Sequence, residues 1–148
     1  MPEPVIICLH QPALELAEKV ASLCDGEVHG LQSRVNTIPK TFEKTKEHLR
    51  DLFQKGHPLV GICSSGILIR SLPNVLSDKN TEPPVLAVAE DGSCVIPLLG
   101  GHHGANELAR KIASGLGVVA AITTAGDLRF GIALDQPPED LALANPED

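Results

Sequence analysis

The chain of 148 residues contains no tryptophan and no tyrosine, and only three phenylalanines. Without rings to stack on bases, it lacks the usual surface for binding single-stranded nucleic acid. Basic residues are also scarce: the chain has 12 Lys and Arg residues but 19 Asp and Glu residues, which gives a formal net charge of −7. That charge argues against binding to the phosphate backbone of nucleic acids. We therefore expect no nucleic-acid partner, and a core of Val, Ile, Leu and Ala as in α/β proteins.

Targeting and metal-binding signals are absent as well. No apolar run is long enough to span a membrane, and the N-terminal segment MPEPVIICLH lacks the basic region and long apolar stretch of a secretory signal. The cysteines Cys8, Cys24, Cys63 and Cys94 form no C-x-x-C pair, so a zinc site is not indicated. Three of them lie in apolar runs, which is typical of buried free thiols in a reducing compartment. We expect a cytoplasmic protein with no membrane partner and no bound metal.

Apolar runs alternate with segments of helical periodicity along most of the chain. Asp91-Gly92 between two apolar runs predicts a β-hairpin. We expect a flavodoxin-like α/β sandwich of three layers, with a mostly parallel sheet and one β-hairpin. The domain is expected over 1–135, and the Pro- and acid-rich segment 136–148 is interpreted as a tail or a linker to a further domain. The predicted strands are 5–9, 27–31, 59–62, 85–89, 94–98 and one after Gly117, and the predicted helices are 12–24, 41–55, 67–72 and 105–116.

A turn rich in glycine and histidine precedes the clearest helix. In residues 105–116 apolar side chains recur at i, i+3, i+4 and i+7, and Gly117 has the position typical of a helix end. Polar groups gather at the start of this helix, where unpaired backbone N–H groups and the positive end of the dipole suit an anion or a developing oxyanion. The residues concerned are Gly101, His102, His103, Gly104, Asn106 and Glu107.

Two interpretations of these polar residues stay open. His102 or His103 is a candidate general base near neutral pH, and Glu107 completes the candidate catalytic group. Alternatively, both histidines are polar turn residues, and the Glu107 carboxylate stabilises the helix dipole. Adjacent histidines without a third ligand at suitable spacing are only a weak metal signal.

A second strand-to-helix junction lies at residues 63–66, Cys-Ser-Ser-Gly. Ser64 or Ser65 is a candidate helix cap, and Gly66 allows a ligand to approach the backbone. Arg70 in the following helix either extends to solvent or faces a carboxylate. No G-x-S-x-G pattern is present, and both serines are poor candidate nucleophiles because the sequence indicates no activating base.

Polar residues follow several of the predicted strands. In an open α/β sheet, ligands bind beyond the carboxyl ends of the strands. The four such ends are His10-Gln11, segment 64–66, turn 100–106, and the loop that contains Thr123, Thr124 and Asp127. If the strands are parallel, these ends lie along one edge. We therefore expect Ser65, His102 and Thr124 to surround a single pocket.

Four sequence blocks between Leu59 and Asp127 resemble those of a known family. They are SGI-x-x-R, the Asp-Gly hairpin, GH-x-GAN-x-LA and TTA-x-D. In this order they are similar to the N-terminal module of the CbiG family, the cobalt-precorrin-5A hydrolases of cobalamin synthesis. The resemblance implies a tetrapyrrole substrate, a corrinoid intermediate whose ring-A lactone is opened with release of acetaldehyde. It implies no cofactor in this domain, since any cobalt would be carried by the substrate.

The resemblance also suggests roles for the residues singled out above. His102 or His103 would be the base, backbone N–H groups near Gly66 and Gly104 would hold the oxyanion, and Arg70 would meet carboxylates of the macrocycle. The expected substrate-binding residues are Ser64, Ser65, Gly66, Arg70, Gly101, Gly104, Asn106, Thr123, Thr124 and Asp127, and the expected catalytic residues are His102, His103 and Glu107.

Two departures from the family pattern suggest an alternative function. The family usually has GH-x-GGAN, with one glycine more than this chain, and its hydrolases carry further domains. The shorter turn and the LANP ending are more similar to the form fused ahead of a precorrin-3B C17-methyltransferase (CobJ). The alternative is thus a non-catalytic accessory domain, in which S-adenosylmethionine would bind only to the fused methyltransferase. A generic α/β interaction domain is the third possibility. Other domains of the same polypeptide or pathway enzymes are the expected partners.

Overall fold

A six-stranded sheet forms the centre of the molecule. The computed structural model describes residues 2–72, 75–76 and 80–125. The strands are β1 (Val5–Cys8), β2 (Glu27–Leu31), β3 (Thr41–Phe42), β4 (Leu59–Ile62), β5 (Val85–Val88) and β6 (Val95–Leu99). Their order is β3-β2-β1-β4-β5-β6, and apart from edge strand β3 this is the 2-1-3-4-5 order of flavodoxin-like sheets. The predicted α/β fold is confirmed.

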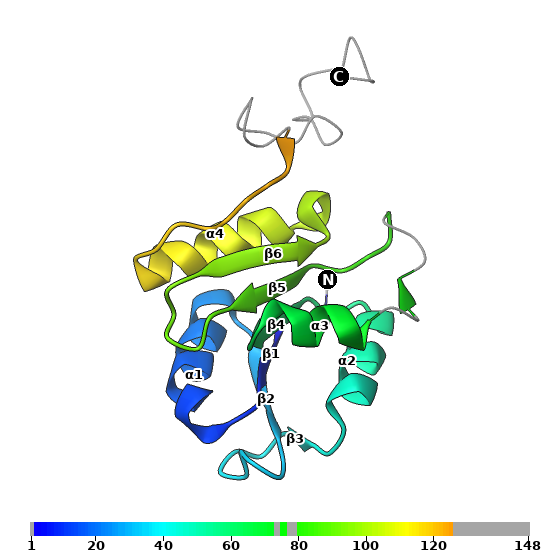
Figure 1. Ribbon diagram of the computed structural model, residues 1–148, viewed down its shortest axis with the longest axis vertical. Helices are drawn as coiled ribbons and strands as arrows, with labels where there is room; N and C mark the ends of the chain where they lie inside the picture. Colours follow the sequence, from blue (N-terminus) through cyan, green and yellow to red (C-terminus); the bar gives the residue numbers. More distant parts are fainter. Residues whose placement is uncertain (1, 73–74, 77–79, 126–148) are drawn as a thin grey trace.

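Helices cover both faces of the sheet (Figure 1). The helices are α1 (Leu14–Cys24), α2 (Thr45–Gln54), α3 (Ser65–Ser71) and α4 (Ala105–Leu116). Helices α1 and α4 contact each other on one face, and α2 and α3 contact each other on the other. Because both faces are covered, β1, β4 and β5 are fully buried and read as continuous apolar runs.

Alternate side chains of each strand enter two separate apolar cores. Ile6, Val60 and Leu86 pack with α1 and α4, whereas the neighbouring residues in each strand pack with α2 and α3. Of the cysteines, Cys8, Cys24 and Cys63 are buried, Cys94 is partly exposed, and all four are free. The predicted buried free thiols are therefore confirmed at three positions.

Strand β6 runs antiparallel to β5, while the other neighbouring strands are parallel. The predicted hairpin connects β5 to β6, and Gly92 at its tip has the positive φ of 74° that favours glycine. Because β6 is reversed, its carboxyl end at Leu99 lies beside Val85, the first residue of β5. Segment 100–106 therefore starts at the amino edge of the parallel strands, opposite the ends of β1 and β4.

Two predicted elements differ from the structure. The helix predicted over 41–55 begins only at Thr45, because Thr41 and Phe42 pair as β3 with Gly30 and Leu31. The strand predicted after Gly117 is reduced to one bridge between Val95 and Ala120, parallel to β6. This segment lies at the outer edge, where Val119 is 88% exposed, so little burial supports a longer strand.

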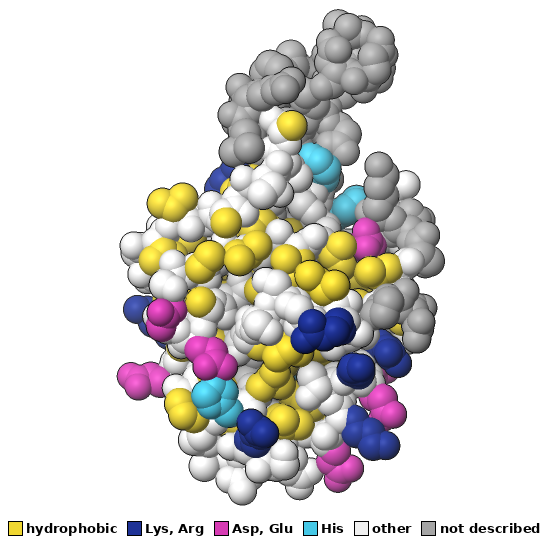
Figure 2. Space-filling view, viewed as in Figure 1, with side chains coloured by type: hydrophobic (Ala, Val, Ile, Leu, Met, Phe, Trp, Pro, Cys, Tyr) yellow, Lys and Arg dark blue, Asp and Glu magenta, His cyan; other side chains and the backbone are white. Residues whose placement is uncertain are grey.

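The surface seen in Figure 2 carries a band of hydrophobic side chains over α3, β5 and β6. It includes an apolar groove of about 160 Å³ lined by Leu68, Ile69, Leu72, Leu76, Val85, Leu98 and Leu99. This groove offers no polar side chain for chemistry. No helix in the described residues is long and apolar enough to cross a membrane.

Candidate active site

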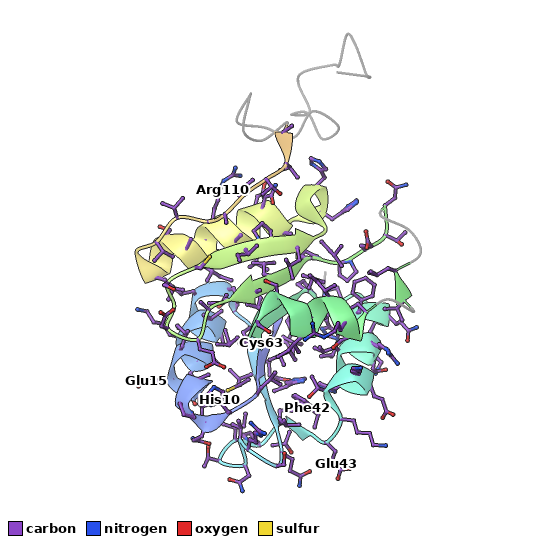
Figure 3. The ribbon with its side chains drawn as sticks, viewed as in Figure 1. His10, Glu15, Phe42, Glu43, Cys63 and Arg110 are labelled. Carbon is purple, nitrogen blue, oxygen red and sulfur yellow. The ribbon has the colours of Figure 1, made fainter. Side chains whose placement is uncertain are left out.

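A cleft of about 470 Å³ opens at the carboxyl ends of the parallel strands. Its lining comes from the ends of β1, β2, β4 and β5 and from the first turn of α3. The strand order reverses between β1 and β4, and such a switch point is where open α/β sheets bind ligands. The lining residues are Leu9, His10, Leu31, Arg34, Cys63, Ser64, Ile67 and Glu90. His10 and Cys63 both lie between α1 and α3 in Figure 3.

An ion pair connects two sides of this cleft. His10 Nε2 lies 2.7 Å from Glu90 Oε1, and the two side chains are 35% and 49% exposed. His10 follows β1 and Glu90 follows β5, with β4 between them in the sheet. Neighbouring strands are about 4.8 Å apart, so the pair spans about 10 Å across the end of β4. It therefore lies over the Cys63-Ser64 junction.

The buried thiol of Cys63 cannot serve as the nucleophile of this cleft. Burial, and to a smaller extent the negative charge of nearby Glu90, raises the pKa of Cys63 to about 12. Only a thiolate is an effective nucleophile. Near neutral pH, Cys63 is therefore an inert part of the cleft wall.

The Ser-Ser-Gly junction and Arg70 lie together beside the cleft. Ser64 precedes α3 in an extended conformation, and its side chain makes no capping hydrogen bond. A Cβ placed on Gly66 would come within 2.8 Å of a guanidinium nitrogen of Arg70, so Arg70 folds back over the first turn of α3. Arg70 is exposed and has no ion-pair partner among the described residues. Its charge is therefore available to a ligand at this edge.

The histidine turn lies at the opposite edge of the sheet. Gly100 and Gly104 have positive φ values of 72° and 102°, and the Gly100 carbonyl accepts hydrogen bonds from the N–H groups of His103 and Ala105. Asn106 is 3% exposed, and its side-chain amide donates a 2.7 Å hydrogen bond to the Thr124 hydroxyl. Gly101 contacts Thr124 as well. The turn is thus fixed by its own backbone and by segment 118–124.

The expectation of one pocket around Ser65, His102 and Thr124 is wrong. His102 and Thr124 belong to the same edge, but Ser65 starts α3 at the other, because β6 is antiparallel. Figure 2 shows histidine side chains in two separate places, beside the start of α4 and beside α1. Glu107 and Thr123 are exposed, and Asp127 lies outside the described residues. The predicted site residues therefore fall into two groups.

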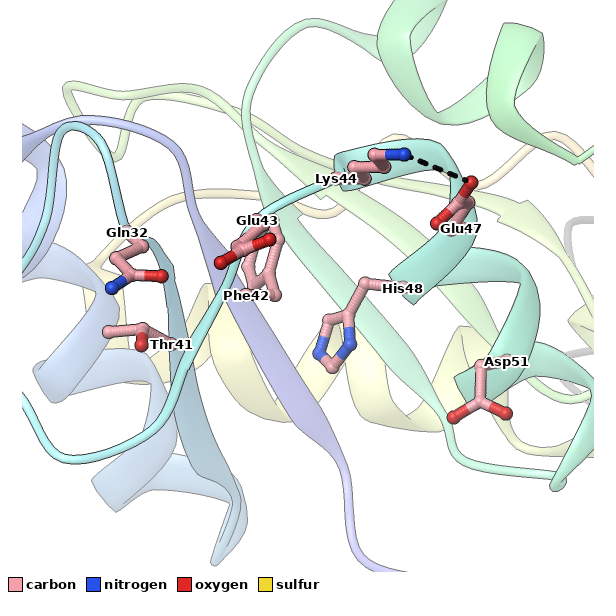
Figure 4. Close-up of a pocket in the computed structure, with 8 residues that line it drawn as sticks. All are labelled: Gln32, Thr41, Phe42, Glu43, Lys44, Glu47, His48 and Asp51. Carbon is pink, nitrogen blue, oxygen red and sulfur yellow. Dashed lines mark ion pairs between the residues drawn. The ribbon is translucent and has the colours of Figure 1, made fainter.

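A second, open cleft of about 600 Å³ lies beside α2 and β3 (Figure 4). Phe42 stacks on His48 in its wall, with ring centroids 4.6 Å apart. His48 Nε2 lies 2.8 Å from His29 Nδ1, and His29 Nε2 lies 2.7 Å from Glu27 Oε1. His29 lies in β2 and His48 in α2, and both residues are partly buried.

Sequence reasoning missed Glu90 and Arg34 as site residues. Neither belongs to a local motif, and only the strand order brings them to His10 and Ser64. Among the described residues, no three His, Cys, Asp or Glu side chains are grouped so that they could hold a metal ion.

Three comparisons relate the chain to known proteins. Residues 47–127 match the model of the family described as cobalamin synthesis G N-terminal. Cobalt-precorrin-5A hydrolase from Priestia megaterium is 40% identical over 88 residues, or 59% of this chain and 24% of the relative. The enzyme of the same name from Salmonella typhimurium is 41% identical over 87 residues, or 58% of this chain and 25% of the relative.

A solved structure supports the fold. The crystal structure of a cobalamin biosynthesis protein G homologue from Sulfolobus solfataricus superimposes with a TM-score of 0.61 at 23% identity. The match covers 82% of this chain and 36% of that one. The chain thus spans about a quarter of the length of the curated relatives it matches.

Proposed function

The chain belongs to the cobalamin synthesis G N-terminal family, and we propose that it is a module of cobalamin biosynthesis that binds a corrinoid intermediate. The reaction proposed for it is of the cobalt-precorrin-5A hydrolase type, in which the ring-A lactone is opened and acetaldehyde is released. The relatives that carry this name supply the reaction type. We propose a cytoplasmic site of action, with other domains or pathway enzymes as partners.

The cleft at the switch point is the observation that carries this proposal. A corrinoid is a broad, largely apolar ring that bears carboxylate side chains. Leu9, Leu31 and Ile67 give the cleft an apolar wall for such a ring, and Arg34 and Arg70 supply positive charge for its carboxylates. This local charge explains how a protein of net charge −7 would hold a polyanion.

Lactone hydrolysis needs an activated water and a stabilised oxyanion. The backbone N–H groups of Ser65 and Gly66 begin α3 at this cleft and are the proposed oxyanion donors. His102, His103 and Glu107 would serve as the catalytic group only for a ligand bound at the opposite edge. Gly101, Gly104, Asn106, Thr123 and Thr124 would then contact that ligand, while Asp127 lies outside the described residues.

The test is to incubate the 148-residue chain with cobalt-precorrin-5A and to assay acetaldehyde and the tetrapyrrole mass. Turnover by the wild-type chain, with loss of binding in Arg34→Ala and Arg70→Ala, supports the proposal. His102→Ala and His103→Ala should leave binding intact. If both arginine variants bind like the wild-type chain and the histidine variants lose binding, the ligand binds at the amino edge and the proposed cleft is wrong.

A binding role without catalysis is the second candidate. It is favoured by the separation of the two polar groups, since the histidine turn and the cleft do not meet within the described residues. In that case the chain would be an accessory domain of a precorrin-3B C17-methyltransferase polypeptide. Tight binding of early corrinoid intermediates without any lactone opening is its expected signature.

A further inference from the structure

We propose that His10 and Glu90 form the carboxylate–imidazole pair that activates water in the cleft at the carboxyl edge. This assignment rests on the proposed lactone hydrolysis for its reaction, and on the geometry of the cleft for its residues. It gives the proposed reaction a base at the same edge as Ser64, Gly66 and Arg70.

Both members of the pair lie in short turns just after strands. His10 comes two residues after the end of β1, and its carbonyl accepts hydrogen bonds from Ala13 N–H and from the Cys8 thiol. Glu90 opens the hairpin after β5, whose turn is closed by bonds from Ala89 N–H to Cys94 and from Gly92 N–H to Ala89. Sites supported in this way keep their geometry better than sites on long loops.

The 2.7 Å contact with the Glu90 carboxylate determines which ring nitrogen of His10 is free. A carboxylate can only accept hydrogen bonds, so His10 Nε2 must carry the hydrogen that fills the 2.7 Å contact. In the neutral imidazole the lone pair then resides on Nδ1. A carboxylate that fixes the tautomer of a catalytic histidine is the arrangement of hydrolase triads. Here it leaves Nδ1 as the atom that accepts a proton.

The proposed step balances with water as the only co-reactant. A water O–H bond breaks, its proton goes to His10 Nδ1, and the water oxygen bonds to the lactone carbonyl carbon. The carbonyl electron pair moves onto oxygen. When this intermediate collapses, the ring C–O bond breaks and the alkoxide takes the proton back from His10. The net change of this lactone-opening step is the addition of water, which gives a carboxylic acid and an alcohol; the release of acetaldehyde breaks a C–C bond and is a separate step.

Stability alone is a weak reason for this pair. Partly exposed ion pairs contribute about 0–1 kcal/mol to the free energy of unfolding, so the His10–Glu90 pair adds little to the stability of the fold. The other titratable group in the wall, Cys63, stays a neutral thiol, and Arg34 carries a fixed charge. His10 is the only imidazole among the side chains that line this cleft.

The tautomer can be measured without any substrate. In ¹⁵N NMR spectra at about pH 8, where imidazoles are neutral, His10 should show hydrogen on Nε2 and a bare Nδ1. His57 is the internal control with the opposite tautomer, because its Nδ1 lies 3.0 Å from the Glu3 carbonyl oxygen and must donate to it. Glu90→Ala should shift His10 toward a mixture of tautomers. Glu15→Ala, which removes an exposed carboxylate of α1, should leave the His10 tautomer unchanged. Hydrogen on His10 Nδ1 in the wild-type chain overturns the proposal.

Kinetics on cobalt-precorrin-5A test the catalytic role. His10→Gln should lower kcat about a hundredfold or more with little change in KM, because the base acts only in the transition state. Glu90→Ala should give a smaller loss of kcat. His57→Gln and Glu15→Ala serve as controls that keep wild-type rates. A fully active His10→Gln variant overturns the proposal, even if the chain hydrolyses the lactone.

The two proposals fail in different ways. If the chain turns over no lactone but the tautomers are as expected, the pair exists and the hydrolase function is wrong. If the chain is active and only His102→Ala or His103→Ala abolishes turnover, the function stands and the base lies at the other edge.

Discussion

The two edges of the sheet carry similarly polar sequences but different structures. At the carboxyl edge, His10, Ser64 and Glu90 surround an open cleft, and their side chains are partly accessible. At the amino edge, Gly100 lies against the Pro83 carbonyl, and Asn106 is buried against Thr124. Polar residues are thus available to a ligand at one edge and are used for folding at the other.

Two polar motifs of similar composition therefore have different roles, one in folding and one at the cleft. The Gly-His-His-Gly turn satisfies backbone groups at the start of α4 and connects α4 to segment 118–124. The Cys-Ser-Ser-Gly junction leaves the Ser64 side chain without a capping bond and lies at the switch point of the sheet. Substitutions at the amino edge should therefore lower the stability of the fold, whereas substitutions at the carboxyl edge should weaken ligand binding and change stability little.

The largest expected effect is on folding, at Gly100. Its φ of 72° disfavours side chains, and an added Cβ would lie 2.9 Å from the Pro83 carbonyl oxygen. Gly100→Ala should lower the free energy of unfolding by about 2–4 kcal/mol in urea titrations. Gly117→Ala is the matched control, with the same φ and no atom within 4 Å, and should lose only about 1 kcal/mol. Equal losses would mean that the turn is not packed as described.

The next prediction compares the loss of stability when one polar residue from each edge is replaced by alanine. Asn106→Ala removes a buried side chain and its hydrogen bond to the partly buried Thr124 hydroxyl, and should cost about 1–3 kcal/mol in the same titrations. Ser64→Ala should be close to neutral for stability, because the exposed hydroxyl caps nothing. A costly Ser64→Ala with a neutral Asn106→Ala would reverse the assignment of the two edges.

A smaller effect should appear in the pH dependence of stability. Burial, and then the charge of His29, lowers the pKa of His48. The folded chain then binds fewer protons than the unfolded one, so stability is complete above the unfolded pKa of about 6.5 and falls as pH drops through it. The hydrogen bond from His29 lowers the pKa of Glu27, which adds a further loss at more acidic pH.

The variant His48→Gln tests this origin. It should flatten the fall of the urea midpoint between about pH 7.5 and pH 5.5, whereas His57→Gln should keep the wild-type slope. Because Phe42 stacks on His48, the substitution should also lower stability at neutral pH. An unchanged slope in His48→Gln would assign the pH dependence to other groups.

The smallest effect concerns thiol reactivity at the carboxyl edge. With its pKa raised to about 12 by burial, Cys63 should be the slower of two thiols to react with iodoacetamide at about pH 8. Cys94, which is partly exposed beside the hairpin, should react first in a mass-spectrometric time course. Rapid alkylation of Cys63 would show that the cleft opens further than described.

Much of the fold follows from local patterns in the sequence. Continuous apolar runs predict β1, β4 and β5, and helical spacing with Gly117 at its end predicts α4 within its observed bounds. Asp91-Gly92 predicts the hairpin. These signals are local, and tertiary packing agrees with them.

The site could be predicted only in part, because its geometry depends on strand direction. The sequence places polar residues after the strands but does not tell on which edge the end of β6 lies. A hairpin reverses β6, and this reversal moves His102 and Thr124 away from Ser65. The contact between His10 and Glu90 joins residues 80 positions apart, and no local pattern indicates it.

The most direct test is to find the edge at which a corrinoid binds. A ¹⁵N-labelled chain would be titrated with cobyrinic acid, a corrinoid that carries several carboxylates, while backbone amide shifts are followed. The structure predicts shifts at His10, Arg34, residues 63–70 and Glu90, with little change at 100–106 and Thr124. Shifts confined to 100–106 and Thr124, with the carboxyl edge unchanged, would contradict the account.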